Sequence, residues 1–159
     1  MYQRQVSFGE AISRALRQYC CFTGRSSRSE YWWFALFCYI ISFAAFAIAI
    51  CLNYSEFAMI AAASNSDMAA DPEFTGAIIS LYSIPTIASL LLFLPAFGLL
   101  FRRLHDAGHS GWWWLISFVP FIGGIVLLVF TLQGSVMEEN KYGPIPNLVG
   151  DQYPPAYNG

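Results

Sequence analysis

Apolar residues along the chain are concentrated in three long blocks separated by polar segments. Residues 31–52, 77–101 and 112–133 contain no Asp, Glu, Lys or Arg. Each block reaches the ~20 residues that a helix needs to cross a hydrocarbon core about 30 Å thick. The pattern therefore predicts an all-α membrane protein with about three transmembrane helices.

The third block leaves two structures open. The stretch "VPFIGGI" places Pro120, Gly123 and Gly124 in its middle, and proline and glycine disfavour a helix interior. The block could therefore be split into two short half-helices that re-enter the membrane and return to the same side. Non-helical backbone at that depth must be buried in protein or lie in water. We therefore expect a full span over 112–133.

Residues 1–30 form a polar segment that contains a helical pattern of its own. Its apolar residues recur every three or four positions: Phe8, Ala11, Ile12, Ala15, Leu16 and Tyr19. This spacing predicts an amphipathic helix, and Ser7 and Glu10 have the spacing of a capping box. Because arginines lie on its polar face, we expect the helix in the cytoplasmic membrane interface. The alternative is a short soluble helix that packs on a partner.

Composition agrees with a membrane protein. Hydrophobic residues make up 57% of the chain and charged residues only 11%, whereas soluble domains carry about 25% charged residues. The block at 31–52 lies behind some thirty polar residues and is longer than the 7–15 apolar residues of a signal sequence. We expect it to be a retained anchor.

The positions of the charges predict the orientation. Five arginines precede the first block and two, at positions 102 and 103, follow the second. The loop 53–76 contains no Lys or Arg and four acidic residues. Basic loops stay in the cytoplasm, so we expect a cytoplasmic N-terminus, a cytoplasmic loop at 102–111 and an acidic outer loop at 53–76. The polar, proline-rich tail, 134–159, should be mostly extended or disordered.

Three stretches of the chain resemble a known family when they are taken together. They are "GRSSRSEYWWF" (24–34), "FRRLHDAGHSGWWWL" (101–115) followed by "VPFIGGIVLLVF" (119–130), and "ENKYGPIP" (139–146). In this order they resemble the bacterial inner-membrane proteins grouped as domain of unknown function 805, the YhaH-like proteins. The resemblance covers about residues 19–146. It implies a small multi-pass protein of the bacterial inner (plasma) membrane, and it implies no activity.

The first two motifs predict a cluster at the cytoplasmic lipid boundary. Its members are Arg25, Arg28, Glu30, Arg102, Arg103, His105, Asp106, Ser110 and Trp112. We expect Glu30 or Asp106 to pair with an arginine of the other motif, since guanidinium groups bind carboxylates and phosphates bidentately. The remaining arginines would face lipid phosphate, and the tryptophans near the block ends would form an aromatic belt.

Further roles follow for the uncharged members and for the tail. We expect His105 to be a neutral donor to a backbone carbonyl and Ser110 to cap the next helix. The resemblance adds the tail motif Asn140, Lys141, Tyr142, Gly143 and Pro144. This motif can join the cluster only if the tail is cytoplasmic.

The sequence favours a non-enzymatic protein that contacts anionic lipid head groups or a protein partner. A small oligomeric transporter or channel is one alternative, although no block contains the ionisable residues that usually mark ion routes. An interfacial enzyme that uses His105 and Asp106 is the other. His105 and His109 have the spacing of a metalloprotease pair, but no third ligand is evident. We expect no catalytic residue, metal, cofactor or nucleic acid, and a homo-oligomer or another membrane protein as further partners.

Overall fold

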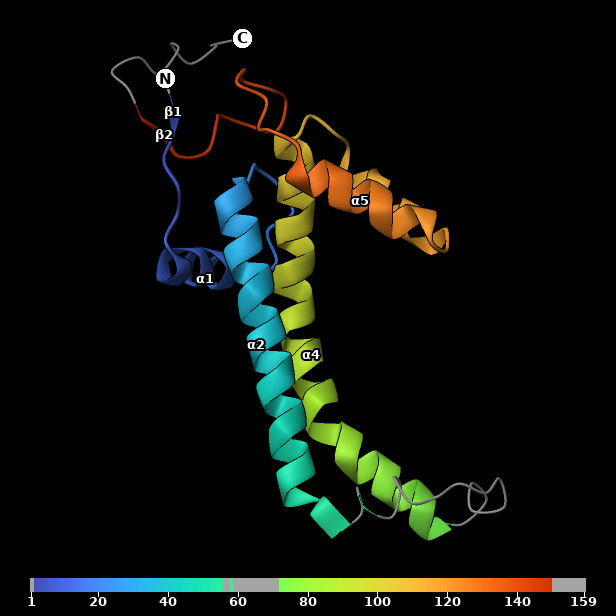
Figure 1. Ribbon diagram of the computed structural model, residues 1–159. Helices are drawn as coiled ribbons and strands as arrows, with labels where there is room; N and C mark the ends of the chain where they lie inside the picture. Colours follow the sequence, from blue (N-terminus) through green and yellow to red (C-terminus); the bar gives the residue numbers. More distant parts are fainter. Residues whose placement is uncertain (1, 56–57, 59–71, 150–159) are drawn as a thin grey trace. The chain divides into compact units, whose positions relative to one another are not determined.

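The computed structural model describes residues 2–55, 58 and 72–149. Its two long helices are α2, Arg28–Leu52, and α4, Pro72–Asp106 (Figure 1). Most of the predicted acidic outer loop lies outside the described residues, including Glu56, Asp67 and Asp71. So does the end of the tail, 150–159.

Helices α2 and α4 are long and apolar enough to cross a membrane. In their most apolar windows only 11% and 17% of residues are buried, whereas a core helix of a soluble protein would be mostly buried. The prediction of helices over the first two blocks is confirmed. They are the two helices of sufficient length in the described part of the chain.

The third block is not one helix. It is divided into the 3₁₀-helix η2, Gly111–Phe118, and the α-helix α5, Ile122–Leu132. The chain turns between them at Pro120 and at Phe121, whose φ is +64°. Gly123 then lies against η2, because a Cβ at this position would be 1.9 Å from the carbonyl oxygen of Ile116. The prediction of a continuous helix over 112–133 is therefore wrong, and the split alternative describes this block.

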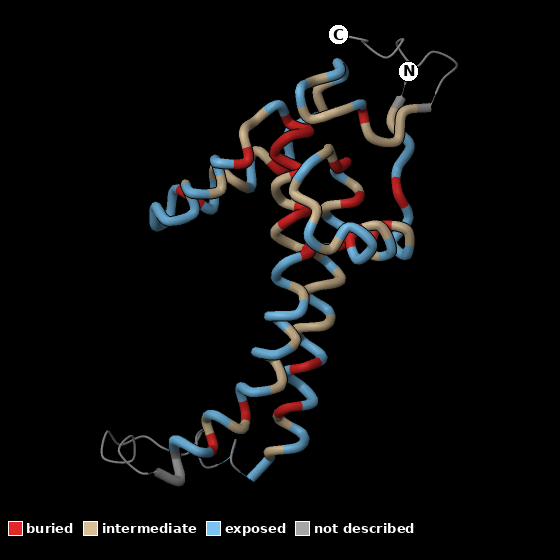
Figure 2. Tube along the Cα trace, turned by 180° about the vertical axis from the view of Figure 1, so that it is seen from behind, coloured by how far each residue is buried: buried red, intermediate tan, exposed pale blue. Residues whose placement is uncertain are grey.

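The described chain contains two compact units. Of the described residues, unit 1 comprises 2–35 and 95–149, and unit 2 comprises 36–55, 58 and 72–94. In unit 2, segments of α2 and α4 bury mainly small side chains, such as Ala45 and Ala49. Large aromatic residues are left exposed, as at Tyr39 and Phe43. Along these helix segments most positions are exposed or intermediate and few are buried (Figure 2).

Unit 1 has an apolar core of its own. Helix α1, Phe8–Arg17, buries Ala11 and Ala15, and further buried side chains come from the chain before α1 and from α2 and α4: Val6, Phe34, Leu99 and Leu104. Strand β1, Tyr2–Gln3, pairs antiparallel with β2, Leu148–Val149, so both ends of the described chain are held together. The described part of the tail, 134–149, thus contains no helix but is packed into the unit.

The start of α1 differs from the capping-box prediction. Ser7 is the N-cap residue, but its side chain makes no capping hydrogen bond. The Glu10 carboxylate instead binds two arginines, with Oε1 2.8 Å from Arg4 Nη2 and 2.6 Å from Arg14 Nη2. The capping-box prediction is therefore wrong, because the Glu10 carboxylate binds guanidinium groups instead of the Ser7 amide.

Candidate functional site: a buried polar cluster

Asp106, the last residue of α4, lies at the centre of a buried ion cluster. Its Oδ1 is 3.1 Å from Arg25 Nε and 3.0 Å from Arg25 Nη2. Its Oδ2 accepts hydrogen bonds from Arg103 and from the Ser135 hydroxyl. The side chains of Arg25, Arg103 and Asp106 are fully buried. Asp106 therefore ties together the approach to α2, the end of α4 and the start of the tail.

The other guanidinium N–H groups of Arg25 and Arg103 donate to backbone carbonyls. Arg103 Nε donates to the carbonyl of Thr131 at 3.1 Å and Nη2 to that of Gln133. These carbonyls lie at the end of α5, where the last turn of a helix lacks backbone donors. Arg25 Nη1 and Nη2 donate to the carbonyls of Glu138 and Val136. The guanidinium groups thus cap α5 and fix the chain that follows it.

A second ion pair lies beside the first. Arg102 Nη1 is 3.8 Å from Glu30 Oε1, and both residues are buried. The prediction that Glu30 or Asp106 pairs with an arginine of the other motif is confirmed, and both carboxylates do so. The Glu30–Arg102 pair is looser, since Arg102 Nε and Nη2 have no hydrogen-bond partner among the described residues.

His105 connects the second motif to the tail motif. Its Nδ1 is 3.3 Å from the carbonyl oxygen of Gly24, and because a carbonyl only accepts, Nδ1 is the donor. The imidazole stacks on the ring of Tyr142, with centroids 3.7 Å apart and planes 4° apart. Asn140 Nδ2 donates to the His105 carbonyl at 3.0 Å. His105 is therefore a donor to a carbonyl, as predicted, and the tail motif joins the cluster.

Asn147 is a member of this network that the sequence did not reveal. Its Oδ1 accepts from Arg14 Nη1 at 2.6 Å, and its Nδ2 donates to Ser27 Oγ at 3.2 Å. A single asparagine outside every motif carries no sequence signal for such a role. In the structure it binds α1 and the start of α2 to the tail.

Four predicted residues lie at the edge of the cluster. Arg28 is exposed, and no hydrogen bond or ion pair to its side chain is present within the described ranges. Ser110 caps η2 by accepting from the Trp112 amide at 3.5 Å, as predicted, and the Trp112 side chain is 74% exposed. Lys141 is exposed, with Nζ 5.1 Å from the Tyr142 ring centroid.

The tail motif ends in a turn. The Gly143 amide donates to the carbonyl of Asn140 at 2.9 Å, and Gly143 has a φ of +128°, which favours glycine. Pro144 follows it and is exposed. The motif residues Gly143 and Pro144 therefore shape the chain rather than contribute side chains to the cluster.

The two histidines have separate partners. His109 Nε2 is 2.8 Å from Gln133 Oε1, and its ring stacks on Phe130, whereas His105 faces Tyr142. In the described part of the chain, no three His, Cys, Asp or Glu side chains converge as metal ligands would. The arrangement can hold segments together by charge, and both oxygens of its central carboxylate accept hydrogen bonds from protein groups.

Comparison with known proteins agrees with this architecture. The chain is 34% identical over 135 residues to the inner membrane protein YhaH of Escherichia coli K12, covering 85% of this chain and 94% of YhaH. It is also 34% identical over 131 residues to the inner membrane protein YhaI of the same strain, covering 82% and 90%. No solved structure matches. The profile of a protein family of unknown function, DUF805, matches residues 19–144. The chain, with its three motifs gathered in unit 1, belongs to the DUF805 family.

Proposed function

We propose that the N-terminal segment, the turn after α4 and the tail all face the cytoplasm. The proposal is supported by the contacts of Arg25 and Asp106 with the tail, because a segment that touches these side chains cannot lie across a bilayer from them. The arginines on the chain before α2 favour the cytoplasmic side. The acidic loop 53–76 would then lie outside.

In this topology the η2–α5 hairpin enters the membrane from the cytoplasmic side and returns. Helix α5 has 11 residues, a length of about 16 Å at ~1.5 Å per residue, which is about half of the hydrocarbon core. Exposed apolar residues at its start and along it, among them Phe121, Ile122 and Ile125, suit contact with lipid tails. The hairpin would thus occupy one leaflet.

Paired reporters fused after Gly159 test this topology, one active only in the cytoplasm and one only outside. This fusion point keeps β2 intact, whereas a fusion after Pro146 would remove it. We expect the cytoplasmic reporter to be active. Activity of the outside reporter would overturn the proposed topology.

We further propose that the protein is non-enzymatic and that its cytoplasmic face binds anionic lipid head groups. The observation that carries this proposal is that the buried carboxylates are paired within the protein while an exposed arginine is not. Glu30 and Asp106 are buried and paired within the protein, whereas Arg28 remains exposed without a partner among the described residues. Each basic residue near an anionic leaflet contributes about 1 kcal/mol of attraction. The polar face of α1, placed in the membrane interface, would add to it.

The contacts of Asp106 argue against the interfacial enzyme. Both oxygens of its carboxylate accept hydrogen bonds from buried or half-buried side chains, those of Arg25, Arg103 and Ser135. The carboxylate is therefore not left as a base for a substrate.

The lipid proposal is tested by unfolding the full chain in two membranes. One contains phosphatidylcholine alone and the other phosphatidylcholine with phosphatidylglycerol. We expect higher stability with phosphatidylglycerol and a difference that shrinks as salt is raised, since salt screens exposed charges. Equal stability in both membranes would exclude lipid recognition. A second copy or another membrane protein would then be the partner to seek.

A further inference from the structure

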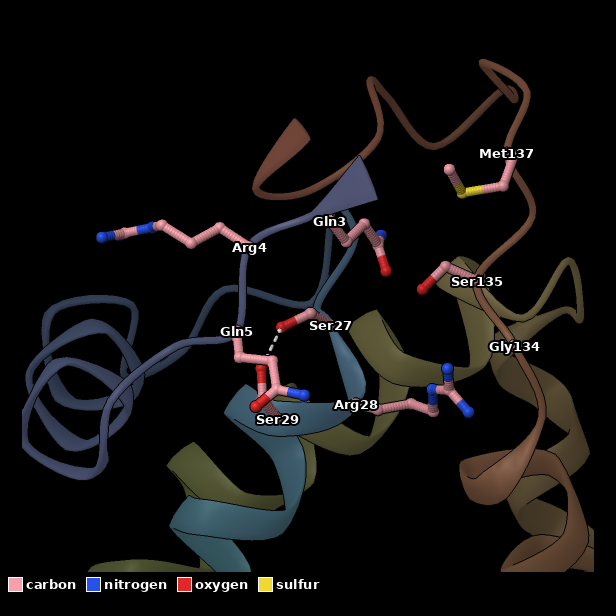
Figure 3. Close-up of a pocket in the computed structure, with 9 residues that line it drawn as sticks. All are labelled: Gln3, Arg4, Gln5, Ser27, Arg28, Ser29, Gly134, Ser135 and Met137. Atoms are coloured by element: carbon pink, nitrogen blue, oxygen red, sulfur yellow. Dashed lines mark hydrogen bonds between the residues drawn. The ribbon is translucent and has the colours of Figure 1, made fainter. Parts of the chain in front are cut away.

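A polar cavity of about 600 Å³ lies in unit 1. It is bounded by strand β1, the start of α2 and the beginning of the tail (Figure 3). Its size falls within the range of small-molecule sites, about 300–1,000 Å³. None of the residues that line it is Asp or Glu. The described lining therefore supplies no carboxylate for a cation.

Two lining side chains have donors without acceptors. The Arg28 guanidinium makes no hydrogen bond or ion pair with the described residues, and Gln3 Nε2 is buried without a hydrogen-bond partner there. Both side chains border the same space, whereas Arg4 points away from it (Figure 3). Arg4 is already paired with Glu10. Because the exposed Arg28 guanidinium has N–H groups without acceptors, the cavity is suited to an occupant that accepts hydrogen bonds.

The serines at the start of α2 leave a third donor. Ser27 Oγ accepts from the Glu30 amide and from Asn147 Nδ2, so its own proton is directed to Ser29 Oγ at 3.2 Å. Ser29 Oγ already accepts from the Val6 amide. With both of its acceptor positions used, the Ser29 hydroxyl proton has no acceptor among these groups.

The surrounding charge is also positive. The cavity adjoins the N-terminus of α2, a helix of 25 residues, where unpaired amides and the helix dipole favour an anion. The adjoining buried cluster has two arginines, Arg25 and Arg103, for one carboxylate, Asp106. The exposed carboxylates Glu138 and Glu139 lie on the tail outside the cavity lining.

We propose that this cavity binds the phosphate group of a phosphate ester, with Arg28 as the bidentate ligand and Ser29 as a further donor. Guanidinium groups bind phosphate oxygens through two parallel hydrogen bonds. The cavity exceeds the size of a phosphate ion, so a polar group such as glycerol fits beside it. A lipid head group and a soluble ester share this chemistry. The inference rests on the proposed function, because it names the place where an anionic head group is held.

The test measures binding to the full chain in neutral detergent. The probes are sn-glycerol 3-phosphate and short-chain phosphatidylglycerol, each titrated by calorimetry. We expect saturable binding of at least one probe, weakened tenfold or more by Arg28→Gln. Arg28→Lys keeps the positive charge but cannot form two parallel hydrogen bonds to a phosphate, so its affinity for the probe should be intermediate. Because Arg28 has no protein partner among the described residues, Arg28→Gln should retain the wild-type unfolding temperature without the probe.

Arg17→Gln is the matched control. It removes the same charge from an exposed residue of α1 that does not line the cavity. We expect its affinity for glycerol phosphate to stay within twofold of wild type.

The outcomes distinguish a lipid head group from a soluble ester, and they distinguish failure of the cavity inference from failure of the proposed lipid-binding face. Arg28-dependent binding of phosphatidylglycerol assigns the cavity to a lipid head group, and Arg28-dependent binding of glycerol phosphate alone assigns it to a soluble ester. Equal losses in Arg28→Gln and Arg17→Gln would overturn the cavity inference but leave the lipid-binding face standing. Binding of phosphatidylglycerol that neither substitution changes would do the same. Binding of neither probe would overturn the inference, and equal stability in the two membranes would then overturn the proposed function as well.

Discussion

Unit 1 buries charged side chains as well as apolar ones, whereas unit 2 buries mainly small apolar side chains and leaves large aromatic ones exposed. In unit 1 the side chains of Arg103 and Asp106 are 0% exposed, while in unit 2 Tyr39 and Phe43 are 74% and 76% exposed. Large exposed aromatics are expected where lipid tails are the solvent, because lipid provides no hydrophobic drive for helices to associate. Unit 2 therefore depends on close approach at small residues, whereas unit 1 combines an apolar core with buried charge pairs.

The two strategies respond differently to change. A buried ion pair adds little net stability over apolar packing, yet removal of one partner is costly because the other charge is left unpaired. Contacts between small residues in lipid are individually weak and numerous. Single substitutions should therefore be far more damaging in the cluster of unit 1 than along the lipid-facing helices of unit 2.

Asp106→Asn should have the largest effect. The amide keeps the shape but leaves Arg25 and Arg103 without a counter-charge in a fully buried site. Loss of one partner of a buried pair costs about 3–5 kcal/mol. The free energy of unfolding in neutral detergent measures it, with Glu139→Gln at an exposed carboxylate as the control. A loss no larger than that of the control would show that the cluster does not hold unit 1 together.

Gly123→Ala should be the next most damaging change. Its Cβ would lie 1.9 Å from the Ile116 carbonyl oxygen, so η2 and α5 would have to separate. Such overpacking costs about 1–3 kcal/mol. Gly124→Ala is the adjacent control, because a Cβ at that position would have no atom within 4 Å and alanine favours a helix by up to about 1 kcal/mol. If the two variants unfold alike, the close hairpin is not a source of stability.

Much of this arrangement could be predicted from the sequence, but not the meeting of the tail with the cluster. The pairing of Glu30 and Asp106 with arginines followed from the charges at the block ends, since carboxylates near a membrane surface need cationic partners. The position of the tail depended on residues 112–133, where Pro120 and Gly123 indicated a turn and the cost of non-helical backbone in lipid indicated a span. The turn prevailed because η2 and α5 pack against each other.

The tail contacts themselves have no sequence signature. Arg25 and Arg103 bind backbone carbonyls at the end of α5 and in the residues after it, and every residue has such a carbonyl. The Tyr142 ring could be placed only once the chain was known to return. Pairing of unlike charges was thus predictable, whereas pairing with backbone required the fold.

Tyr142→Leu should weaken the attachment of the tail motif. Its ring stacks on His105 at 3.7 Å, and aromatic pairs contribute about 0.5–1.5 kcal/mol beyond their buried area. Limited proteolysis of the tail measures the loss, which should appear as faster cleavage after residue 133. Tyr142→Phe keeps the ring and should be cleaved at the wild-type rate. Faster cleavage of both variants would assign the effect to the hydroxyl instead of the stack.

Ser80→Ala tests how much unit 2 depends on polar pairing. Its effect on the free energy of unfolding should be the smallest of the four. Ser80 Oγ donates to Asn53 Oδ1 at 2.7 Å, which links α4 to the end of α2. Such bonds between membrane helices contribute about 0.6 kcal/mol on average, because the separated helices also find partners. Ser83→Ala is the control, since Ser83 bonds only the Ser80 carbonyl of its own helix in the described structure. A loss at Ser80 as large as that of Asp106→Asn would mean that unit 2 also depends on polar pairing, and the contrast between the units would be lost.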